Sequence, residues 1–187
     1  MNSLPHEAKV VVVGGGIAGC STAYHLAKNG WDTVLIERDV LTSGTTWHAA
    51  GMITQLGTTP QITKIRKSSI KFYKDLKDIT GEDTSFRHTG TINIATTKPR
   101  YQEYLRQLTM SKLHNLDIEL INKKRFKDLY PIAKNKDVFG GLYIPEDGQA
   151  DPEILTKVIA TAAKKEGVKI FEKCKLQKIL KRDNQIR

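Results

Sequence analysis

The 187-residue sequence lacks any run of about 18 apolar residues, so it offers no transmembrane span. It has only two cysteines, Cys20 and Cys174, and neither a CxxC pair nor a cysteine–histidine cluster. These absences argue against a disulfide framework and a structural zinc site, and we expect no metal. The first residues, MNSLPHEAK, show no basic n-region with an apolar stretch and no arginine-rich transit pattern. We expect a cytoplasmic protein, or one of the mitochondrial matrix if a targeting segment has been removed.

The charge is unbalanced, because 30 lysines and arginines face 20 acids and leave a net charge of +10. A basic excess can indicate a nucleic acid, an anionic membrane or an acidic small molecule as partner. The lysines are spread along helical faces, and no zinc-finger, helix-turn-helix or RNA-recognition signature accompanies them. We therefore interpret the excess as a solvated basic surface and predict no nucleic-acid partner, with nucleic-acid binding as a minor alternative.

The sequence opens with the pattern of a βαβ unit. Residues 9–13 (KVVVV) include four consecutive β-branched valines with no turn residue among them, as expected for a buried parallel strand. Apolar residues at helix-packing positions follow, Gly30 ends that pattern, and residues 33–36 (TVLI) form the next expected strand. A strand, a helix and a second strand in so short a stretch predict an α/β fold with a doubly wound parallel sheet.

Hydrophobic periodicity and turn residues place the remaining elements. The predicted helices cover residues 62–79, 99–113, 123–129 and 152–166, the last with Asp151 as its N-cap and Pro152 at its first position. The predicted strands cover residues 88–95, 118–121, 140–144, 168–171 and 176–180. Residues 41–57 are expected to form a loop with a short helix, and Asp183 and Asn184 a hairpin turn.

The first motif that carries chemistry is Gly14-x-Gly16-x-x-Gly19, with Glu37 at the tip of the second strand. Gly14 permits the tight turn, Gly16 lets a pyrophosphate approach the backbone, and Gly19 lets the helix lie close to the strand. The free N–H groups at the helix start would then face the phosphates. Glu37 can accept hydrogen bonds from both hydroxyls of an adenosine ribose, and its charge would repel a 2′-phosphate. The motif predicts a dinucleotide site that rejects NADP; the alternative is a glycine turn without a ligand.

The second motif is the loop at residues 43–51 (SGTTWHAAG). Small residues on both sides of Trp47 and His48 suggest backbone packed against something flat or anionic. The hydroxyls of Thr45 and Thr46 can donate to a phosphate or to a ribityl chain. A dinucleotide extended from the ribose-binding acid through the glycine turn would bring its redox end near this loop. From spacing alone, a purely structural histidine remains the alternative for His48.

Together, the glycine motif and the loop at 43–51 resemble the N-terminal region of the dimethylglycine dehydrogenase and sarcosine dehydrogenase family, within the glycine-oxidase/D-amino-acid-oxidase-like flavoproteins. Residues 140–152 (GGLYIPEDGQADP) resemble the run that joins the substrate domain back to the FAD-binding domain in that family. The resemblance implies a Rossmann-like α/β FAD-binding domain with the start of an α+β substrate domain. It divides the chain into a first FAD-binding part (1–57), a partial substrate domain (58–144) and an incomplete return to the FAD-binding domain (145–187). Because the family fold needs a considerably longer chain, we expect a truncated one.

The same resemblance implies FAD as cofactor, with the flavin methyl group bonded covalently to His48. Leu176 stands where family members place a residue beside the adenine. The candidate cofactor-binding residues are Gly14, Gly15, Gly16, Ile17, Ala18, Gly19, Glu37, Arg38, Thr45, Thr46, His48, Ala50, Gly51 and Leu176.

The implied activity is oxidative demethylation of an N-methyl glycine derivative, either sarcosine or dimethylglycine. A hydride passes from the N-methyl carbon to flavin N5, and water hydrolyses the resulting iminium to an amine and formaldehyde. We assign no catalytic residue. The substrate carboxylate requires an arginine or lysine clamp, for which Arg66, Arg87, Lys98 and Arg100 are candidates, although each is alternatively a surface charge. His88 and Tyr143 are candidates for lining the pocket, with a structural role as the alternative.

The resemblance also suggests partners and rival functions. Electrons leave to an electron-transfer flavoprotein in the family, and a small N-methylated amino acid is the expected substrate. Tetrahydrofolate is expected only if a missing C-terminal domain exists. One alternative is an FAD-dependent oxidase of another secondary amine or amino acid. Another is a catalytically inactive, flavoprotein-like regulatory subunit or fragment; the known family example of such a subunit lacks the Trp-His pair, so His48 argues against it.

Overall fold

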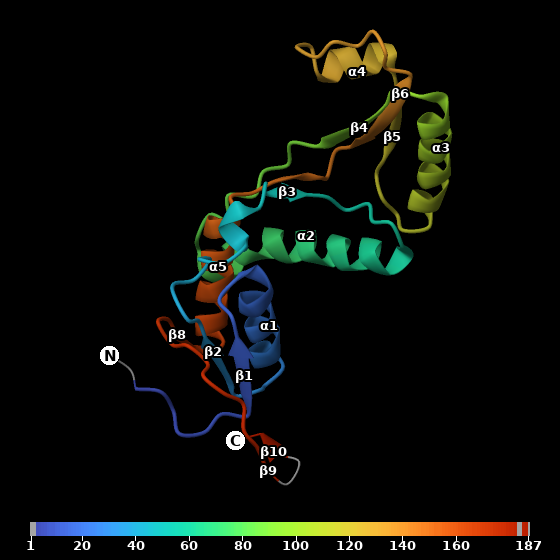
Figure 1. Ribbon diagram of the computed structural model, residues 1–187. Coiled ribbons are helices and arrows are strands. Elements are labelled where there is room, and N and C mark those ends of the chain that lie inside the picture. Colours follow the sequence, from blue (N-terminus) through green and yellow to red (C-terminus); the bar gives the residue numbers. More distant parts are fainter. Residues whose placement is uncertain (1–2, 183–184, 187) are drawn as a thin grey trace. The chain divides into compact units, whose positions relative to one another are not determined.

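A computed structural model describes residues 3–182 and 185–186, and the chain divides into two compact units (Figure 1). Unit 1 comprises Met1–Gly51, Tyr73–Ser85 and Asp151–Arg187, and unit 2 comprises Met52–Phe72 and Phe86–Ala150. The roles expected for residues 1–57, 58–144 and 145–187 stay a prediction.

Unit 1 is built on a parallel sheet of three strands in the order β1-β2-β8. The sheet consists of β1 (Val10–Val13), β2 (Thr33–Ile36) and β8 (Lys169–Phe171). All four residues of β2 are buried, as befits a strand with a neighbour on each side. The unit also contains the α-helices α1 (Ile17–Lys28) and α5 (Pro152–Lys165) and the short 3₁₀ helix η1 (Thr46–His48).

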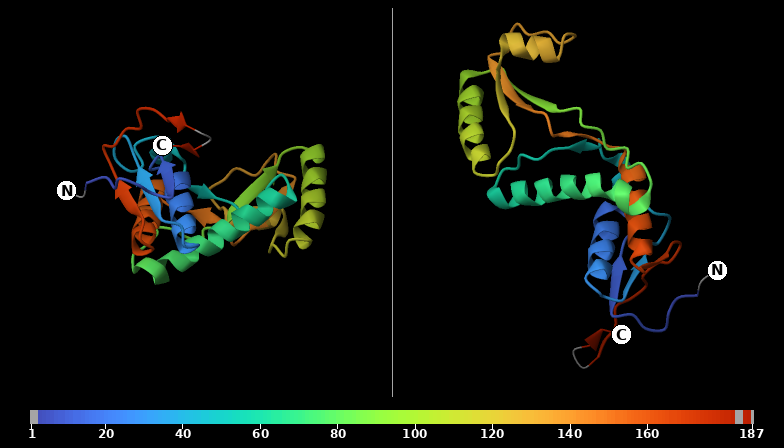
Figure 2. Two further views of the ribbon diagram at one scale, coloured as in Figure 1. Left: turned by 90° about the horizontal axis from the view of Figure 1, so that it is seen from below. Right: turned by 180° about the vertical axis from the view of Figure 1, so that it is seen from behind.

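Helices α1 and α5 pack against each other beside this sheet, as the views in Figures 1 and 2 agree. Cys20 and Ala23 of α1 and Ile159 and Ala163 of α5 are completely buried. The small side chains of Cys20, Ala23 and Ala163 allow the two helices to pack closely. The side chain of Asp151 accepts the backbone N–H groups of Glu153 and Ile154 at 2.8 and 3.0 Å, so the predicted start of α5 is confirmed. The predicted α/β fold class is confirmed as well.

Unit 2 contains an antiparallel sheet in the order β4-β6-β5. Its strands are β4 (Thr91–Ala95), β5 (Glu119–Asn122) and β6 (Gly140–Ile144), and a separate short pair joins β3 (Met52–Ile53) to β7 (Gly148–Gln149). The helices are α3 (Lys98–Lys112) and α4 (Lys123–Leu129). A Cβ atom at Gly140 would lie 2.6 Å from the Tyr101 ring, so this glycine lets α3 lie close to the sheet. Strand β4 is shorter than predicted, because Gly90 just before it has a positive φ of 68°.

Helix α2 (Pro60–Thr80) contributes to both units, its first part to unit 2 and its last part to unit 1. The sequence predicts an apolar stripe along this helix. The stripe is buried at Leu76, whereas Ile62 and Ile65 are 39% and 61% exposed. The apolar pattern therefore identifies the helix but not how much of its face is covered.

The predicted strand at 176–180 is wrong. These residues form no strand, and Leu176, Ile179 and Leu180 are 39%, 61% and 47% exposed. A strand requires a hydrogen-bonded neighbour, and among the described residues only the two-residue pair β9 (Lys181–Arg182) and β10 (Gln185–Ile186) forms in this region. The predicted turn at Asp183 and Asn184 lies outside the described residues. Over the described part of the chain, no helix is long and apolar enough to cross a bilayer.

Candidate functional site

The glycine turn between β1 and α1 has the geometry that its motif predicts. Gly14 has a φ of 110°, a region that residues with a Cβ atom rarely adopt. A Cβ atom on Gly19 would lie 1.9 Å from the carbonyl oxygen of Gly14, so only glycine allows the helix to come this close to the strand. Helix α1 therefore begins directly against the end of β1.

The carboxylate of Glu37 is fixed against this turn. One oxygen, Oε2, accepts the backbone N–H of Gly15 at 2.6 Å, and the other, Oε1, accepts the N–H of Asp39 at 2.9 Å. Only 9% of Glu37 is exposed. Because a carboxylate offers about four acceptor positions, these two bonds leave capacity for further hydroxyl donors.

The first turn of α1 retains free hydrogen-bond donors. Gly16 is the N-cap residue and has no side chain to accept an N–H, and the first turn contains no acid. Within the described residues, no acceptor takes the N–H groups of Gly16 and Ala18, whereas the N–H of Ile17 bonds to Thr46 Oγ1 at 3.1 Å. Such a helix start favours an anion, because its donors and its dipole both point outward.

The loop after β2 is fastened onto the glycine turn. The N–H of Thr42 donates to the carbonyl oxygen of Gly15 at 3.0 Å, and Thr42 and Thr46 are both buried. Thr42 has a φ of 72°, which is unusual for a β-branched residue. The sequence analysis singled out Thr46 but missed Thr42, because no sequence signal marks a backbone contact between residues 15 and 42.

His48 lies on η1 in a defined orientation. Its Nδ1 atom is 3.2 Å from the carbonyl oxygen of Gly44, and its ring centroid lies 3.7 Å from that of Trp47. Because a carbonyl oxygen can only accept, Nδ1 carries the hydrogen in this bond, and in the neutral imidazole Nε2 then holds the lone pair. His48 is exposed, as are Thr45 and Ala50, while Gly51 is partly buried.

The segment after β8 is bonded to the segment that follows β2. The N–H of Cys174 donates to the carbonyl oxygen of Glu37 at 2.8 Å, and the N–H of Lys173 donates to that of Asp39 at 2.7 Å. Lys173 also forms an ion pair with Asp39, which holds the pKa of that carboxyl below its usual value. Leu176 follows this junction and is 39% exposed, and Arg38 is exposed. The structure thus brings the chain near Leu176 to the segment that contains Glu37.

In unit 2, the buried carboxylate of Asp147 joins two distant segments. Its Oδ1 accepts the N–H of Gln55 at 2.7 Å, and its Oδ2 accepts the hydroxyl of Thr91 at 2.6 Å. Asp147 is completely buried, and this burial raises the pKa of its carboxyl, although the two hydrogen bonds and the charge of Arg66 oppose the shift. Asp147 is not among the candidate residues that the sequence predicted.

The four candidate clamps differ in their surroundings. Arg66 donates through Nη1 to the Thr54 hydroxyl at 3.1 Å and to the Leu56 carbonyl at 2.7 Å. Its other guanidinium donors meet no acceptor among the described residues. Arg87 donates to the Phe86 carbonyl, and Lys98 and Arg100 lie exposed in the first turn of α3. Arg66 thus differs from Arg87 in that two neutral acceptors, the Thr54 hydroxyl and the Leu56 carbonyl, hold one of its nitrogens.

His88 and Tyr143, the two candidate pocket residues of unit 2, have different surroundings. The Nδ1 atom of His88 lies 3.1 Å from the carbonyl oxygen of Glu146, a contact that fixes the ring locally. Tyr143 lines a cavity of ≈ 570 Å³ together with Ile92 and Phe126.

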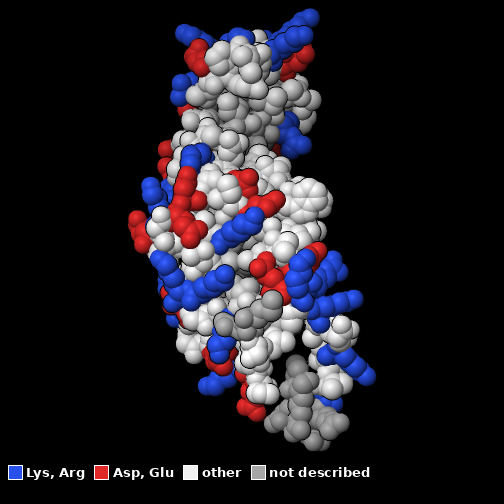
Figure 3. Space-filling model, turned by 90° about the vertical axis from the view of Figure 1, so that its left-hand side faces the viewer, with Lys and Arg blue, Asp and Glu red and all other residues white. Residues whose placement is uncertain are grey.

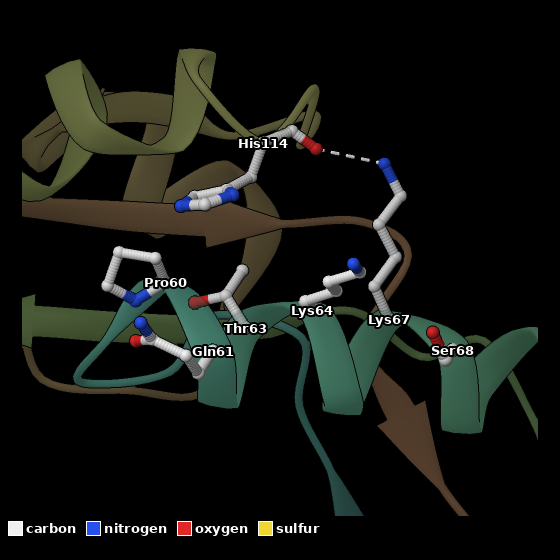
Figure 4. A pocket seen from close by; sticks show the side chains of 7 residues that line it. All are labelled: Pro60, Gln61, Thr63, Lys64, Lys67, Ser68 and His114. Atoms are coloured by element: carbon white, nitrogen blue, oxygen red, sulfur yellow. Dashed lines mark hydrogen bonds between the residues drawn. The ribbon is translucent and has the colours of Figure 1, made fainter.

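A separate groove in unit 2 has a volume of ≈ 360 Å³ (Figure 4). Its lining includes Lys64 and Lys67 of α2, and the ring of His114 lies above the first turn of that helix. Lys67 reaches across to donate to the carbonyl oxygens of His114 and Asn115, at 2.9 and 3.1 Å. These carbonyls follow the end of α3, where a cation is favourable, so we interpret Lys67 as structural.

Charged side chains of both signs share the face shown in Figure 3, and the described residues contain no cluster of metal ligands. Within residues 3–182 and 185–186, no cluster of three histidine, cysteine, aspartate or glutamate side chains could hold a metal ion. On the face shown in Figure 3, acidic side chains lie among the basic ones. The basic side chains on this face are therefore interspersed with acidic ones.

The chain matches the family described as "DAO: FAD dependent oxidoreductase" over residues 9–187, and it belongs to that family. Dimethylglycine dehydrogenase of Rattus norvegicus, a mitochondrial protein, is 41% identical over 163 residues, which are 87% of this chain and 19% of that relative. The formaldehyde-forming 4-methylaminobutanoate oxidase of Paenarthrobacter nicotinovorans is 38% identical over 98% of this chain and 22% of the oxidase. The expected resemblance is confirmed.

A solved structure shares the fold over nearly the whole chain. L-proline dehydrogenase from P. horikoshii superposes with a TM-score of 0.92 at 28% identity, over 98% of this chain and 48% of that one. The chain thus spans about a fifth of the two curated relatives and about half of the solved structure.

Proposed function

We propose that this chain provides the FAD-binding segment of an oxidoreductase that demethylates an N-methylated glycine derivative, sarcosine or dimethylglycine, with the flavin bonded covalently to His48. The observation that carries the proposal is the hydrogen bond from Gly15 to Glu37, beside a helix start with free donors. An acid that binds the ribose and a turn that binds the phosphates must lie side by side to hold one dinucleotide, and the contact between Glu37 and Gly15 supports these two roles.

The donors and acceptors of unit 1 suit the diphosphate and ribose of FAD. The N–H groups of Gly16 and Ala18 are available to phosphate oxygens, with no acid in the first turn to repel them. Glu37 keeps acceptor capacity for ribose hydroxyls after its two backbone bonds. Thr45, Ala50 and Gly51 are proposed to line the flavin side, and Arg38 and Leu176 the adenine side.

Attachment through His48 is supported by its tautomer and its exposure. A nitrogen that forms a bond to carbon must present a lone pair, and in the neutral imidazole the hydrogen bond from Nδ1 to Gly44 leaves that lone pair on Nε2. The neighbouring Trp47 ring holds the imidazole plane at an interplanar angle of 33°. We therefore propose Nε2 as the attachment atom.

The chemistry is divided between cofactor and chain. When bound, the flavin supplies hydride acceptance at N5 from the N-methyl carbon, and water then releases formaldehyde. The chain's own task is to bind and orient the substrate. Arg66 is the proposed carboxylate clamp, because Thr54 and Leu56 fix one of its nitrogens and leave the others for a planar anion. The substrate is a small N-methylated amino acid, and an electron-transfer flavoprotein is the proposed electron acceptor.

One alternative substrate class has specific support. The relative named as a 4-methylaminobutanoate oxidase matches 98% of this chain, so an oxidase of another secondary amine is the second candidate. The dehydrogenase and the oxidase can be distinguished by comparing oxygen uptake with reduction of an artificial dye. The substrates to compare are sarcosine, dimethylglycine and 4-methylaminobutanoate. A catalytically silent regulatory role is opposed by the exposed His48 with its Nε2 lone pair.

The test of the proposal is covalent flavin retention. The chain is expressed with FAD available, denatured in acid and run on a gel. We expect flavin fluorescence to stay with the protein band and His48→Ala to abolish it. The matched control is His114→Ala, which removes a histidine of unit 2 and should leave the fluorescent band intact. Release of all flavin from the wild-type chain, or retention by His48→Ala, contradicts the attachment.

A further inference from the structure

The cavity of ≈ 570 Å³ lies on one face of the β4-β6-β5 sheet in unit 2. Ile92 and Tyr143 are directly paired across β4 and β6, so their side chains project from the same face of the sheet. Ile94 lies on that face two residues further along β4. These three side chains form the floor of the cavity.

Two aromatic residues, Phe126 in the middle of α4 and Tyr130 at its C-cap, form the wall of the cavity. Phe126 is 3% exposed and belongs to the local core, and Tyr130 follows the helix with its ring 6.4 Å from that of Phe126, edge to face. Tyr130 itself is 48% exposed. The cavity therefore combines an aliphatic floor with aromatic rings, a lining that favours a flat apolar body.

Two polar groups of this lining are uncommitted. The Tyr143 hydroxyl and the Lys134 ammonium make no hydrogen bond or ion pair with any described residue. The Tyr143 ring is held in place because Gly90 lies against it: a Cβ atom there would be 2.6 Å from Cε2. Lys127, by contrast, donates to the carbonyl oxygens of Pro131 and Ala133 and so braces the turn that carries Lys134.

We propose that this cavity is a binding site for a small aromatic monocarboxylate. Its ring lies against Ile92, Ile94 and Tyr130, and its carboxylate accepts hydrogen bonds from Lys134 and Tyr143. The volume falls in the range of small-molecule pockets, about 300–1,000 Å³. No acidic residue lines the cavity, and Glu119, the cross-strand neighbour of Tyr143 on β5, is paired with Arg125. A cationic amine would be repelled by Lys134, and a phosphate dianion would exceed the charge that one lysine offers. All residues that line the cavity belong to unit 2.

The test is a titration of the full 187-residue chain with 3-phenylpropanoate, followed by amide chemical shifts. We expect saturable shifts confined to β4, β6 and residues 126–134. Lys134→Gln should weaken binding about three- to tenfold, the size of a charge-assisted hydrogen bond at a solvent-facing site. Tyr143→Phe should weaken it about two- to tenfold through the lost hydroxyl. Both variants keep the cavity walls.

The controls distinguish specific binding in the cavity from non-specific binding to an apolar surface. Lys136→Gln removes an exposed lysine two residues from Lys134 that does not line the cavity, and it should bind like the wild type. The neutral analogue 3-phenylpropan-1-ol should bind more weakly than the acid and equally to the wild type and Lys134→Gln. Absence of saturable shifts, shifts at another surface, or equal effects of Lys134→Gln and Lys136→Gln would each overturn the proposal.

Discussion

The carboxylate of Glu37 accepts the backbone N–H of Gly15 at 2.6 Å, across 22 residues of sequence. This bond connects the end of β2 to the turn between β1 and α1, and it holds the proposed ribose acceptor beside the proposed phosphate donors. Its strength can be measured without any ligand.

Glu37→Gln should destabilise the chain. A glutamine has one acceptor oxygen and presents N–H donors on the other side, so one of the N–H groups of Gly15 and Asp39 loses its acceptor. Leaving a buried donor unsatisfied costs about 1–3 kcal/mol. Urea unfolding measures this loss, and Glu82→Gln, at an exposed position, is the matched control. Equal midpoints for the two variants would show that the Glu37 bond contributes nothing to stability.

Gly19→Ala should separate α1 from β1. The added Cβ atom would lie 1.9 Å from the Gly14 carbonyl oxygen, and backbone cannot yield as a flexible side chain does. We expect a loss of about 1–3 kcal/mol or more, typical of an overfilled contact. Gly44→Ala is the control, since a Cβ atom there meets nothing within 4 Å. Thermal unfolding of Gly19→Ala and Gly44→Ala measures the two losses of stability. An unchanged midpoint for Gly19→Ala would refute the close contact.

Asp147 should make stability fall as pH rises. Burial raises the pKa of its carboxyl in the folded chain above the ordinary 3.8, so the folded state holds this proton more tightly than the unfolded state. The resulting stabilisation is complete below pH 3.8 and is lost as the pH rises through the folded-state pKa. Asp147→Asn does not titrate and keeps an oxygen for the Gln55 N–H.

The measurement is a series of urea unfolding curves across that pH range. The difference in stability between the wild type and Asp147→Asn should shift in favour of the variant as pH rises. Asp137→Asn changes an exposed carboxyl and should follow the wild type. If the curves of the wild type and Asp147→Asn run parallel, the carboxyl does not couple to folding.

The two cysteines should differ in reactivity. Burial, with the charge of Glu37 as the second cause, raises the pKa of the Cys20 thiol to about 12, whereas Cys174 is partly exposed. Because the thiolate is the nucleophile, iodoacetamide at mildly alkaline pH should modify Cys174 alone in the folded chain. Mass spectrometry should find a single adduct, absent in Cys174→Ser, and a second adduct only in urea. Rapid modification of Cys20 in the folded state would contradict its burial.

Local sequence signals predicted the fold well where the structure depends on neighbouring residues. The predicted bounds of β2, α4 and β6 agree with the structure, because caps, glycines and short apolar runs act within a few residues. The strand predicted at 176–180 failed because pairing requires a distant neighbour that no local pattern reveals. The same limit explains the exposed Ile65 on α2, whose covering surface the periodicity does not specify.

The residues of the candidate site also differ in whether the sequence alone could predict them. The glycine spacing and Glu37 were recognisable, since each residue type has a mechanical reason at that position. Other contacts could not be predicted, because they join residues that are distant in the sequence and meet only in the folded chain. Examples are the contact of Thr42 with Gly15 and the bond from Gln55 to Asp147, across 92 residues. Thr46 was chosen for its hydroxyl as a donor, yet in the structure that oxygen accepts the N–H of Ile17. The cofactor contacts of all these residues stay a prediction.

The stacking of Trp47 on His48 gives the chain an internal optical reporter. The two rings lie 3.7 Å apart, and Trp47 is 53% exposed, so any proton or carbon substituent gained by the imidazole changes the surroundings of the indole. Trp31 is the other tryptophan in the sequence, and replacing it leaves Trp47 as the sole source of tryptophan emission. The emission of one side chain would then follow the chemical state of its neighbour in real time, in the intact protein and without an added dye.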